Sequence, residues 1–150
     1  MKKIRVLFLC TGNRARSQMA EGFLRQSAGH RFEAYSAGTK PKGLSPITVE
    51  VMREVGIDVS HHRSKSVGEF VSEDFDYVIT VCEVARTACP RFDRSKRQLH
   101  WKVTDPAQLE ATGLVSIEAF RAARDELRAR IEEFIRREPP ERELRRPPSS

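Results

Sequence analysis

The chain has 150 residues, of which 32% are charged and 39% hydrophobic, and this composition predicts one soluble globular domain with a substantial core. Its net charge is +6, but no aromatic-rich basic motif accompanies the basic residues, which argues against a nucleic-acid partner. The apolar runs are too short for a membrane span or a secretion signal, so we expect a cytoplasmic protein without a membrane partner.

Apolar runs alternate with segments of helical periodicity along most of the chain. In chain order, the predicted elements are a strand at Ile4–Leu9, a helix at Ser17–Ala28, a strand at Phe32–Ser36, a helix from Pro46 to Gly56, strands at Phe75–Val81 and Gln98–Trp101, and a helix at Ser116–Arg137. This alternation predicts a single three-layer α/β domain, in which helices flank a central four-stranded parallel sheet. We assign the domain to residues 1–137 and expect 138–150, rich in proline and charge, to form a disordered tail.

The segment Cys10–Ser17, with the sequence CTGNRARS, connects the first predicted strand to the first predicted helix. A strand that leads through a tight loop into a helix gathers backbone N–H groups at the positive end of the helix dipole, which forms an anion site. A cysteine at the base of such a site ionises below its free pKa of about 8.5. An arginine offers a planar fork that suits a tetrahedral oxyanion. The spacing of Cys10 and Arg16 therefore predicts a thiolate nucleophile aimed at a phosphate-like group.

Further motifs extend beyond this loop. The stretch CTGNRARSQMAEGF from Cys10, the stretch YSAGT at Tyr35–Thr39 and the pair Asp105-Pro106 resemble the low-molecular-weight tyrosine phosphatase superfold. With Cys82 and Cys89 added, the chain is similar to the thioredoxin-coupled arsenate reductases of that superfold, over roughly residues 4–137. The resemblance implies a low-molecular-weight phosphatase-like fold and arsenate as the substrate, with phosphate or sulfate as mimics. It also implies thioredoxin as the electron donor and no bound cofactor.

The resemblance further implies roles for the loop residues and for one aspartate. Cys10 is the nucleophile that attacks arsenate, Ser17 hydrogen-bonds its thiolate, and Asp105 protonates the departing oxygen. The oxyanion is bound by the loop residues Thr11, Gly12, Asn13, Arg14, Ala15, Arg16 and Ser17. These roles agree with the chemistry, because thiolate attack requires a sulfur of low pKa and the leaving oxygen requires a proton donor.

The two remaining cysteines supply electrons in the mechanism that the resemblance implies. Cys82 attacks the sulfur of the Cys10–arsenic adduct, which releases arsenite and leaves a Cys10–Cys82 disulfide. Cys89 then attacks Cys82, and thioredoxin reduces the resulting Cys82–Cys89 disulfide. A helix would separate these two residues by about 10 Å, whereas a disulfide needs Cα atoms about 4.4–6.8 Å apart. We therefore predict that residues 82–89, if helical when reduced, unwind or loop out on oxidation.

The sequence departs from the family pattern at two positions. Arg14 stands where relatives often carry serine, and it adds positive charge at the mouth of the loop. Lys65 stands where some relatives place an aspartate in a potassium site, whose other members appear here as Asn13, Glu21 and Ser36. We hypothesise that the ammonium of Lys65 replaces the potassium ion, so that this equivalent of the cation site holds no metal.

Several residues also have a structural interpretation. Cys82 and Cys89 can be inert thiols, and Asp105 before a proline can simply start a turn. The adjacent His61 and His62 are expected to be loop residues rather than metal ligands, since no other ligand stands at metal-binding spacing.

Two other functions compete with arsenate reduction. The first is a low-molecular-weight tyrosine phosphatase that hydrolyses phosphate monoesters, with water as the second nucleophile. The second is a non-enzymatic oxyanion-binding or redox-sensing protein. Phosphatases of this fold often carry aromatic residues after the aspartate-proline pair, but here Ala107, Gln108 and Leu109 follow, which favours the reductase. A monomer is the default expectation.

Overall fold

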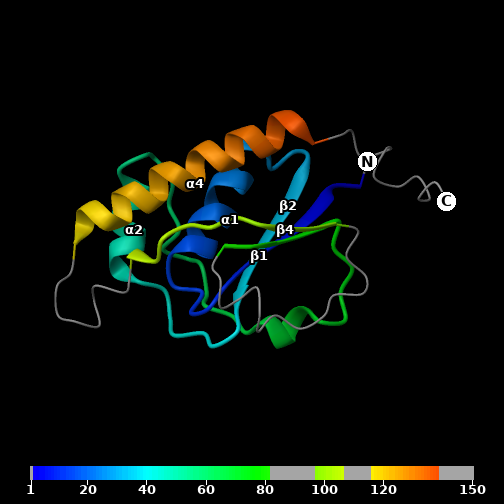
Figure 1. The fold of residues 1–150 in the computed structure, drawn as a ribbon, viewed down its shortest axis with the longest axis horizontal. Coiled ribbons are helices and arrows are strands. Elements are labelled where there is room, and N and C mark those ends of the chain that lie inside the picture. Colours follow the sequence, from blue (N-terminus) through cyan, green and yellow to red (C-terminus); the bar gives the residue numbers. More distant parts are fainter. Residues whose placement is uncertain (1, 82–96, 107–115, 139–150) are drawn as a thin grey trace.

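A computed structural model describes residues 2–81, 97–106 and 116–138 (Figure 1). The elements, in chain order, are β1 (Ile4–Cys10), α1 (Arg16–Ala28), β2 (Phe32–Gly38), α2 (Pro46–Arg53), the short 3-10 helix η1 (Val67–Phe70), β3 (Tyr77–Thr80), β4 (Arg97–His100) and α4 (Ile117–Arg137). No helix in these ranges is long and apolar enough to cross a membrane. The predictions for Cys82, Cys89 and residues 139–150 of the tail concern parts of the chain outside the described residues.

The strands form one parallel sheet in the order β2-β1-β3-β4. β1 lies inside the sheet, and its residues Val6–Leu9 are fully buried, as the apolar run in the sequence predicts. Cys10 at the end of β1 lies opposite Gly38 of β2, and Leu9 lies opposite Thr80 of β3. The carboxyl ends of these strands therefore meet at one edge of the sheet, where parallel α/β sheets bind ligands.

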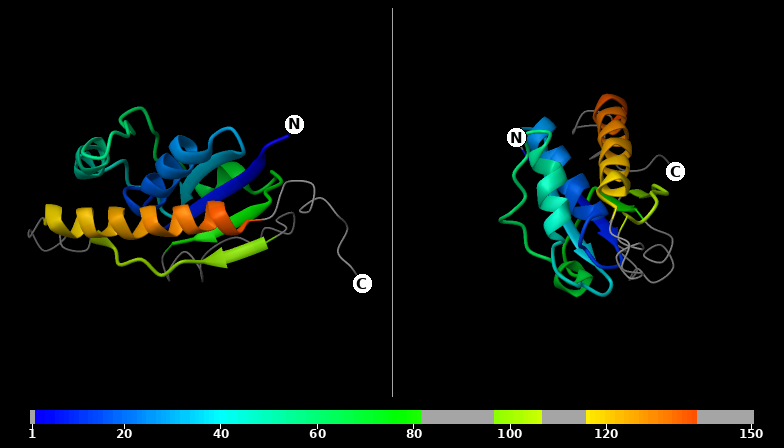
Figure 2. Two further views of the ribbon diagram at one scale, coloured as in Figure 1. Left: turned by 90° about the horizontal axis from the view of Figure 1, so that it is seen from above. Right: turned by 90° about the vertical axis from the view of Figure 1, so that its left-hand side faces the viewer.

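Aromatic contacts define the layers on either side of the sheet. The ring centroid of Phe134 on α4 lies 5.5 Å from that of Phe32 on β2 and 5.1 Å from that of Tyr77 on β3. Side chains alternate along a strand, so Tyr35 points to the opposite face, where its ring centroid lies 5.8 Å from that of Phe70 in η1. The helices α1 and α4 pack together on one face of the sheet, with α2 against α4, and η1 covers the other face, as Figure 2 shows. The predicted three-layer α/β domain is confirmed.

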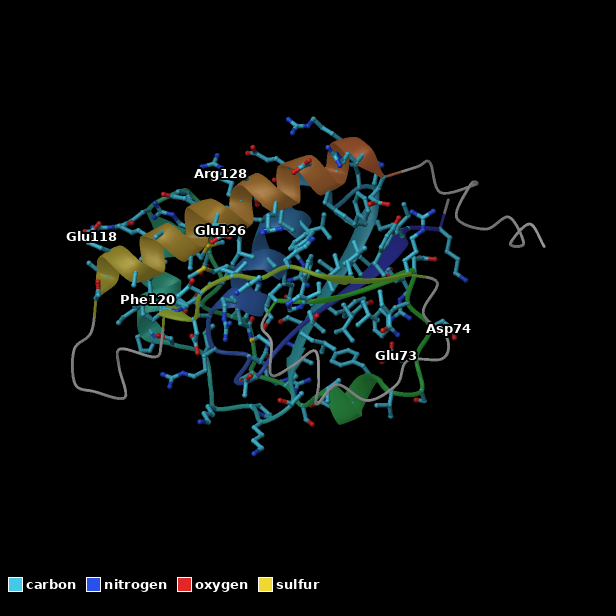
Figure 3. The ribbon with its side chains drawn as sticks, viewed as in Figure 1. Glu73, Asp74, Glu118, Phe120, Glu126 and Arg128 are labelled. Carbon is cyan, nitrogen blue, oxygen red and sulfur yellow. The ribbon has the colours of Figure 1, made fainter. Side chains whose placement is uncertain are left out.

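α4 is amphipathic, as its sequence periodicity predicts. Phe120 is fully buried on its inner side, whereas Glu118 and Arg128 project from the helix with side chains 76% and 52% exposed (Figure 3). The hydroxyl of Ser116 caps the helix by accepting the backbone N–H of Ala119 at 3.3 Å. Beyond the last turn, the carboxylate of Glu138 accepts a hydrogen bond from the phenol of Tyr77.

The helix α2 and the strand β3 are shorter than predicted, β2 extends two residues further than predicted, and the other elements differ by one residue at one or both ends. α2 ends at Arg53 instead of at Gly56, because the N–H of Ile57 turns back to the carbonyl of Met52 at 3.0 Å. Gly56 adopts φ +81° in the turn that follows, a conformation that favours glycine. β3 is shorter than the predicted strand at Phe75–Val81, because its ladder with β1 pairs only the residues from Tyr77 to Thr80.

Candidate active site

The loop between β1 and α1 turns its carbonyl groups outward. The carbonyls of residues 10 to 14 accept, in order, from Thr39 N at 3.2 Å, Lys40 N at 2.8 Å, Lys42 N at 2.9 Å, Gln18 Nε2 at 3.2 Å and Ser45 N at 3.2 Å. In a trans peptide the carbonyl and the following N–H point in opposite directions, and no peptide in the described chain is cis. The N–H groups of residues 11 to 15 therefore face the inside of the loop, which is the arrangement of an anion-binding nest.

The thiol of Cys10 lies at the base of this loop and is 2% exposed. Its sulfur accepts the backbone N–H of Asn13 at 3.2 Å and lies 2.8 Å from the hydroxyl oxygen of Ser17. Hydrogen bonds donated to the sulfur favour the thiolate over the thiol.

Asn13 fixes the direction of the hydrogen bond between Ser17 and Cys10. Its Oδ1 accepts the backbone N–H of Lys65 at 2.9 Å, so its amide nitrogen is the atom that faces Ser17 Oγ at 2.8 Å and Ser36 Oγ at 3.0 Å. Ser17 Oγ accepts from Asn13, and a Cys10 thiolate can only accept, so the hydrogen of Ser17 is directed to the sulfur. Asn13 has φ +49°, a left-handed conformation that asparagine tolerates better than most residues.

Arg16, the first residue of α1, carries the guanidinium of the site and is only 6% exposed. Its Nη1 donates to the carbonyl of Val103 at 3.0 Å and to that of Val81 at 3.4 Å. Its Nη2 lies 3.3 Å from the carboxylate of Asp105, which follows β4 in the chain. Carbonyls that follow β3 and β4 thus orient the guanidinium of Arg16, and the predicted acid lies beside it.

Gly38 permits the close approach of β2 to the loop. A Cβ atom at this position would lie 2.6 Å from the carbonyl oxygen of Thr11 and 2.9 Å from the backbone nitrogen of Asn13. Both atoms belong to the backbone, so no side-chain rotation could relieve the clash. The loop keeps its shape only because residue 38 has no side chain.

Behind the loop, the carboxylate of Glu21 is 5% exposed and collects several partners. Ser36 donates its hydroxyl to Oε1 at 2.7 Å, and the ammonium of Lys65 lies 3.9 Å from the same oxygen. Nη2 of Arg25 lies 3.0 Å from Oε2, and Nε2 of His62 lies 3.5 Å from it. Burial lowers the pKa of both Lys65 and His62. The predicted members of the cation site are therefore adjacent, with an ammonium group already among them.

A potassium ion does not fit this set of residues. A cation bound by Glu21 and Ser36 would lie next to the ammonium of Lys65 and be repelled by it. The ammonium itself donates to the carbonyl of Arg63 at 2.6 Å, so it is held at this position. Among the residues that the structure describes, no group of three His, Cys, Asp or Glu side chains could hold a metal ion.

The structure brings Cys10, Asn13, Arg16, Ser17 and Asp105 together, as the sequence predicts. The stem of Arg14, a half-buried residue, packs beside Gly12 at the same loop. Two buried polar residues were not predicted to belong to the site, namely Gln18 and His62. Gln18 lies within the stretch CTGNRARSQMAEGF, but the resemblance gave it no role, and His62 was expected to be a loop residue.

The sequence is similar to those of known proteins over most of its length. Residues 5–146 match the low molecular weight phosphotyrosine protein phosphatase family. An arsenate reductase of Halalkalibacterium halodurans is 40% identical over 134 residues, which cover 89% of this chain and 96% of that protein.

Solved structures share the fold over a similar length. An arsenate reductase in the phosphate-binding state has a TM-score of 0.78 at 31% identity, covering 89% of this chain and 97% of that one. A thioredoxin-dependent arsenate reductase of Corynebacterium glutamicum has a TM-score of 0.70 at 29% identity, covering 89% of this chain and 61% of that one.

Proposed function

The chain belongs to the low molecular weight phosphotyrosine protein phosphatase family, and we propose that within this family it is an arsenate reductase. The observation that carries the proposal is the sulfur of Cys10, which receives hydrogen bonds from Asn13 and Ser17 beneath inward-facing amides. A thiolate in such a loop is a nucleophile for a tetrahedral oxyanion. The relatives that are arsenate reductases align with nearly the whole chain, which supports arsenate as that oxyanion.

In the first step, arsenate binds with its oxygens directed to the loop amides and to Arg16. The sulfur of Cys10 attacks arsenic, and one oxygen leaves as water after receiving a proton from Asp105. The carboxyl of Asp105 lies 3.3 Å from the guanidinium of Arg16, which places the acid beside the group that binds the oxyanion. Asp105 is 31% exposed, so solvent can return a proton to it after each turnover.

In the next steps, thiols supply the two electrons. Cys82 attacks the sulfur of Cys10, the electron pair of the sulfur–arsenic bond passes to arsenic, and arsenite leaves. Cys89 then attacks Cys82, which frees Cys10, and the dithiol of thioredoxin reduces the Cys82–Cys89 disulfide. The carbonyl of Val81, the residue before Cys82, accepts a hydrogen bond from Arg16 at 3.4 Å. The residue that precedes Cys82 therefore lies beside the guanidinium that binds the oxyanion.

Lys65 supplies the positive charge that a potassium ion would bring to the residues behind the loop. Its ammonium lies 3.9 Å from Glu21, and its backbone N–H holds the side chain of Asn13 at 2.9 Å. The loop geometry that orients Asn13 toward Ser17 is thus supported by a residue of the chain itself. Turnover is accordingly independent of potassium.

The test is coupled turnover with arsenate, thioredoxin, thioredoxin reductase and NADPH. NADPH consumption that requires arsenate supports the proposal if it is lost in Cys82→Ser, which forms no disulfide, and in Cys89→Ser, which stops at the Cys10–Cys82 disulfide. A Cys10→Ser variant should show no consumption at all. Consumption that does not depend on arsenate, or that persists in both serine variants, contradicts it.

Phosphatase activity is the second candidate, because the matching family is one of phosphotyrosine phosphatases. Its first step uses the same Cys10 and Asp105, but water instead of Cys82 resolves the covalent intermediate. Under this alternative, Cys82→Ser and Cys89→Ser hydrolyse p-nitrophenyl phosphate as fast as the parent protein, and arsenate elicits no thiol oxidation.

The proposed setting is a cytoplasmic monomer that meets thioredoxin as its protein partner and carries no bound cofactor. A cascade of free thiols requires a reducing compartment, in which structural disulfides do not persist. Sedimentation with and without thioredoxin tests the oligomeric state.

A further inference from the structure

Gln18 lies in the first turn of α1, is completely buried, and turns its side chain away from the substrate side of the loop. Its Nε2 lies 2.9 Å from Oδ1 of Asn13, 3.2 Å from the carbonyl of Asn13 and 3.1 Å from the carbonyl of Arg63. All three partners are acceptors, so this end of the side chain is the NH₂ group. The carbonyl end, Oε1, then faces Nδ1 of His62 at 2.9 Å.

The contact with Gln18 determines the tautomer of His62. Because Oε1 of Gln18 can only accept, Nδ1 of His62 carries the hydrogen. Nε2 of the ring lies 3.4 Å from Nη1 of Arg25, a donor, and 3.5 Å from Oε2 of Glu21, an acceptor. The imidazole ring of His62 therefore donates toward the active-site loop through Nδ1.

We propose that Gln18 is a positioning residue for the nucleophile, acting through Asn13 and Ser17. Hydrogen bonds run in one direction from Nδ1 of His62 to Gln18, from Gln18 to Asn13, from Asn13 to Ser17 and from Ser17 to the sulfur of Cys10. Gln18, Asn13 and Ser17 each accept one hydrogen bond of this series and donate the next. The series is therefore polarised toward the sulfur of Cys10 and stabilises its negative charge.

Gln18 also holds Asn13 in its left-handed conformation. The same NH₂ group bonds the side-chain oxygen and the main-chain oxygen of Asn13, which ties the side chain to the backbone at φ +49°. Without this bond, the N–H of Lys65 would be the one described donor left to Oδ1 of Asn13. The inference rests on the proposed function only in taking Cys10 as the nucleophile.

The test reads the Cys10 thiol directly, in a Cys82→Ser/Cys89→Ser background where it is the only thiol of the chain. The pH dependence of alkylation by iodoacetamide gives the thiol pKa, and hydrolysis of p-nitrophenyl phosphate gives kcat and KM. Gln18→Met keeps the length of the side chain but removes its hydrogen bonds. Gln26→Met, at an exposed position of the same helix, is the matched control.

We expect Gln18→Met to raise the pKa of Cys10 by about one unit, which slows alkylation below that pKa about tenfold. We expect kcat to fall more than KM changes, and Gln26→Met to match the parent protein. An unchanged thiol pKa in folded Gln18→Met would overturn the proposal. Arsenate turnover plays no part in this readout, so failure of the proposed function would be seen separately.

A second pair of variants keeps the test decisive if Gln18→Met does not fold. His62→Leu removes the N–H that orients Gln18, whereas His62→Asn keeps an N–H at the corresponding branch of the side chain. A raised thiol pKa in His62→Leu that His62→Asn restores supports the relay. The same pKa in both variants contradicts the assigned direction of the hydrogen bonds.

Discussion

We expect the replacement of Lys65 with alanine to make arsenate turnover respond to potassium. Two unit charges 3.9 Å apart attract by about 4 kcal/mol at an effective dielectric constant of about 20. The burial that lowers the pKa of Lys65 offsets part of this attraction. Glu21 also keeps Arg25 at 3.0 Å, so we expect Lys65→Ala to lose about 1–3 kcal/mol of unfolding free energy.

The variant leaves oxygen atoms of Glu21 and Ser36 without the ammonium group, and the shortened side chain leaves space for a small cation. We expect kcat/KM for arsenate to fall severalfold and to recover as potassium chloride is added. Choline chloride at equal ionic strength should not restore it, since choline is too large for the space. Lys3→Ala, at an exposed position, is the control for loss of one positive charge.

Potassium activation of the parent protein would refute this reasoning, because the ammonium of Lys65 would then not replace the ion. Equal potassium response of Lys65→Ala and Lys3→Ala would refute it as well. The stability loss alone does not decide the question, because any buried ion pair would show it.

Three further predictions concern other residues of the site. Gly38→Ala places a Cβ 2.6 Å from the backbone of Thr11, so thermal unfolding should show a loss of about 1–3 kcal/mol together with weaker phosphate binding; unchanged binding would contradict the role of this close approach. Asp105→Asn should slow single-turnover formation of arsenite about 100-fold or more, and a rate equal to that of the parent would remove Asp105 as the acid. Burial lowers the pKa of His62, so as the pH falls the imidazole takes up its proton in the unfolded chain before it does so in the folded one. The free energy of unfolding is therefore fully retained above about pH 6.5 and decreases as the pH falls below that value. Denaturation of His62→Leu should therefore depend less steeply on pH in that range than denaturation of the parent, and parallel curves would count against the buried neutral ring.

The loop could be predicted from the sequence because its parts are close together in the chain. Cys10 and Arg16 lie in one segment between an apolar run and a helical pattern, and both neighbouring elements form as predicted. The sheet followed from alternation of strands with helices, although the exact ends of α2 and β3 depend on contacts with residues distant in sequence.

Contacts between residues far apart in the sequence could not be predicted from local sequence patterns. Asp105 was assigned to the site from a family resemblance, because it contacts Arg16 but follows a different strand, far along the sequence. Gln18 and His62 were missed because a buried glutamine on a helix and a histidine in a connecting segment are ordinary features by themselves. The role of these two residues depends on which atoms donate and accept hydrogen bonds in the folded protein, and the sequence alone does not show this.

The most direct measurement of the central claim is disulfide mapping after one turnover without thioredoxin. The fully reduced protein is mixed with excess arsenate, free thiols are alkylated, and peptides are identified by mass spectrometry. The account predicts a Cys82–Cys89 disulfide, a free Cys10 thiol and one arsenite released per chain. Three alkylated cysteines and no arsenite would contradict it.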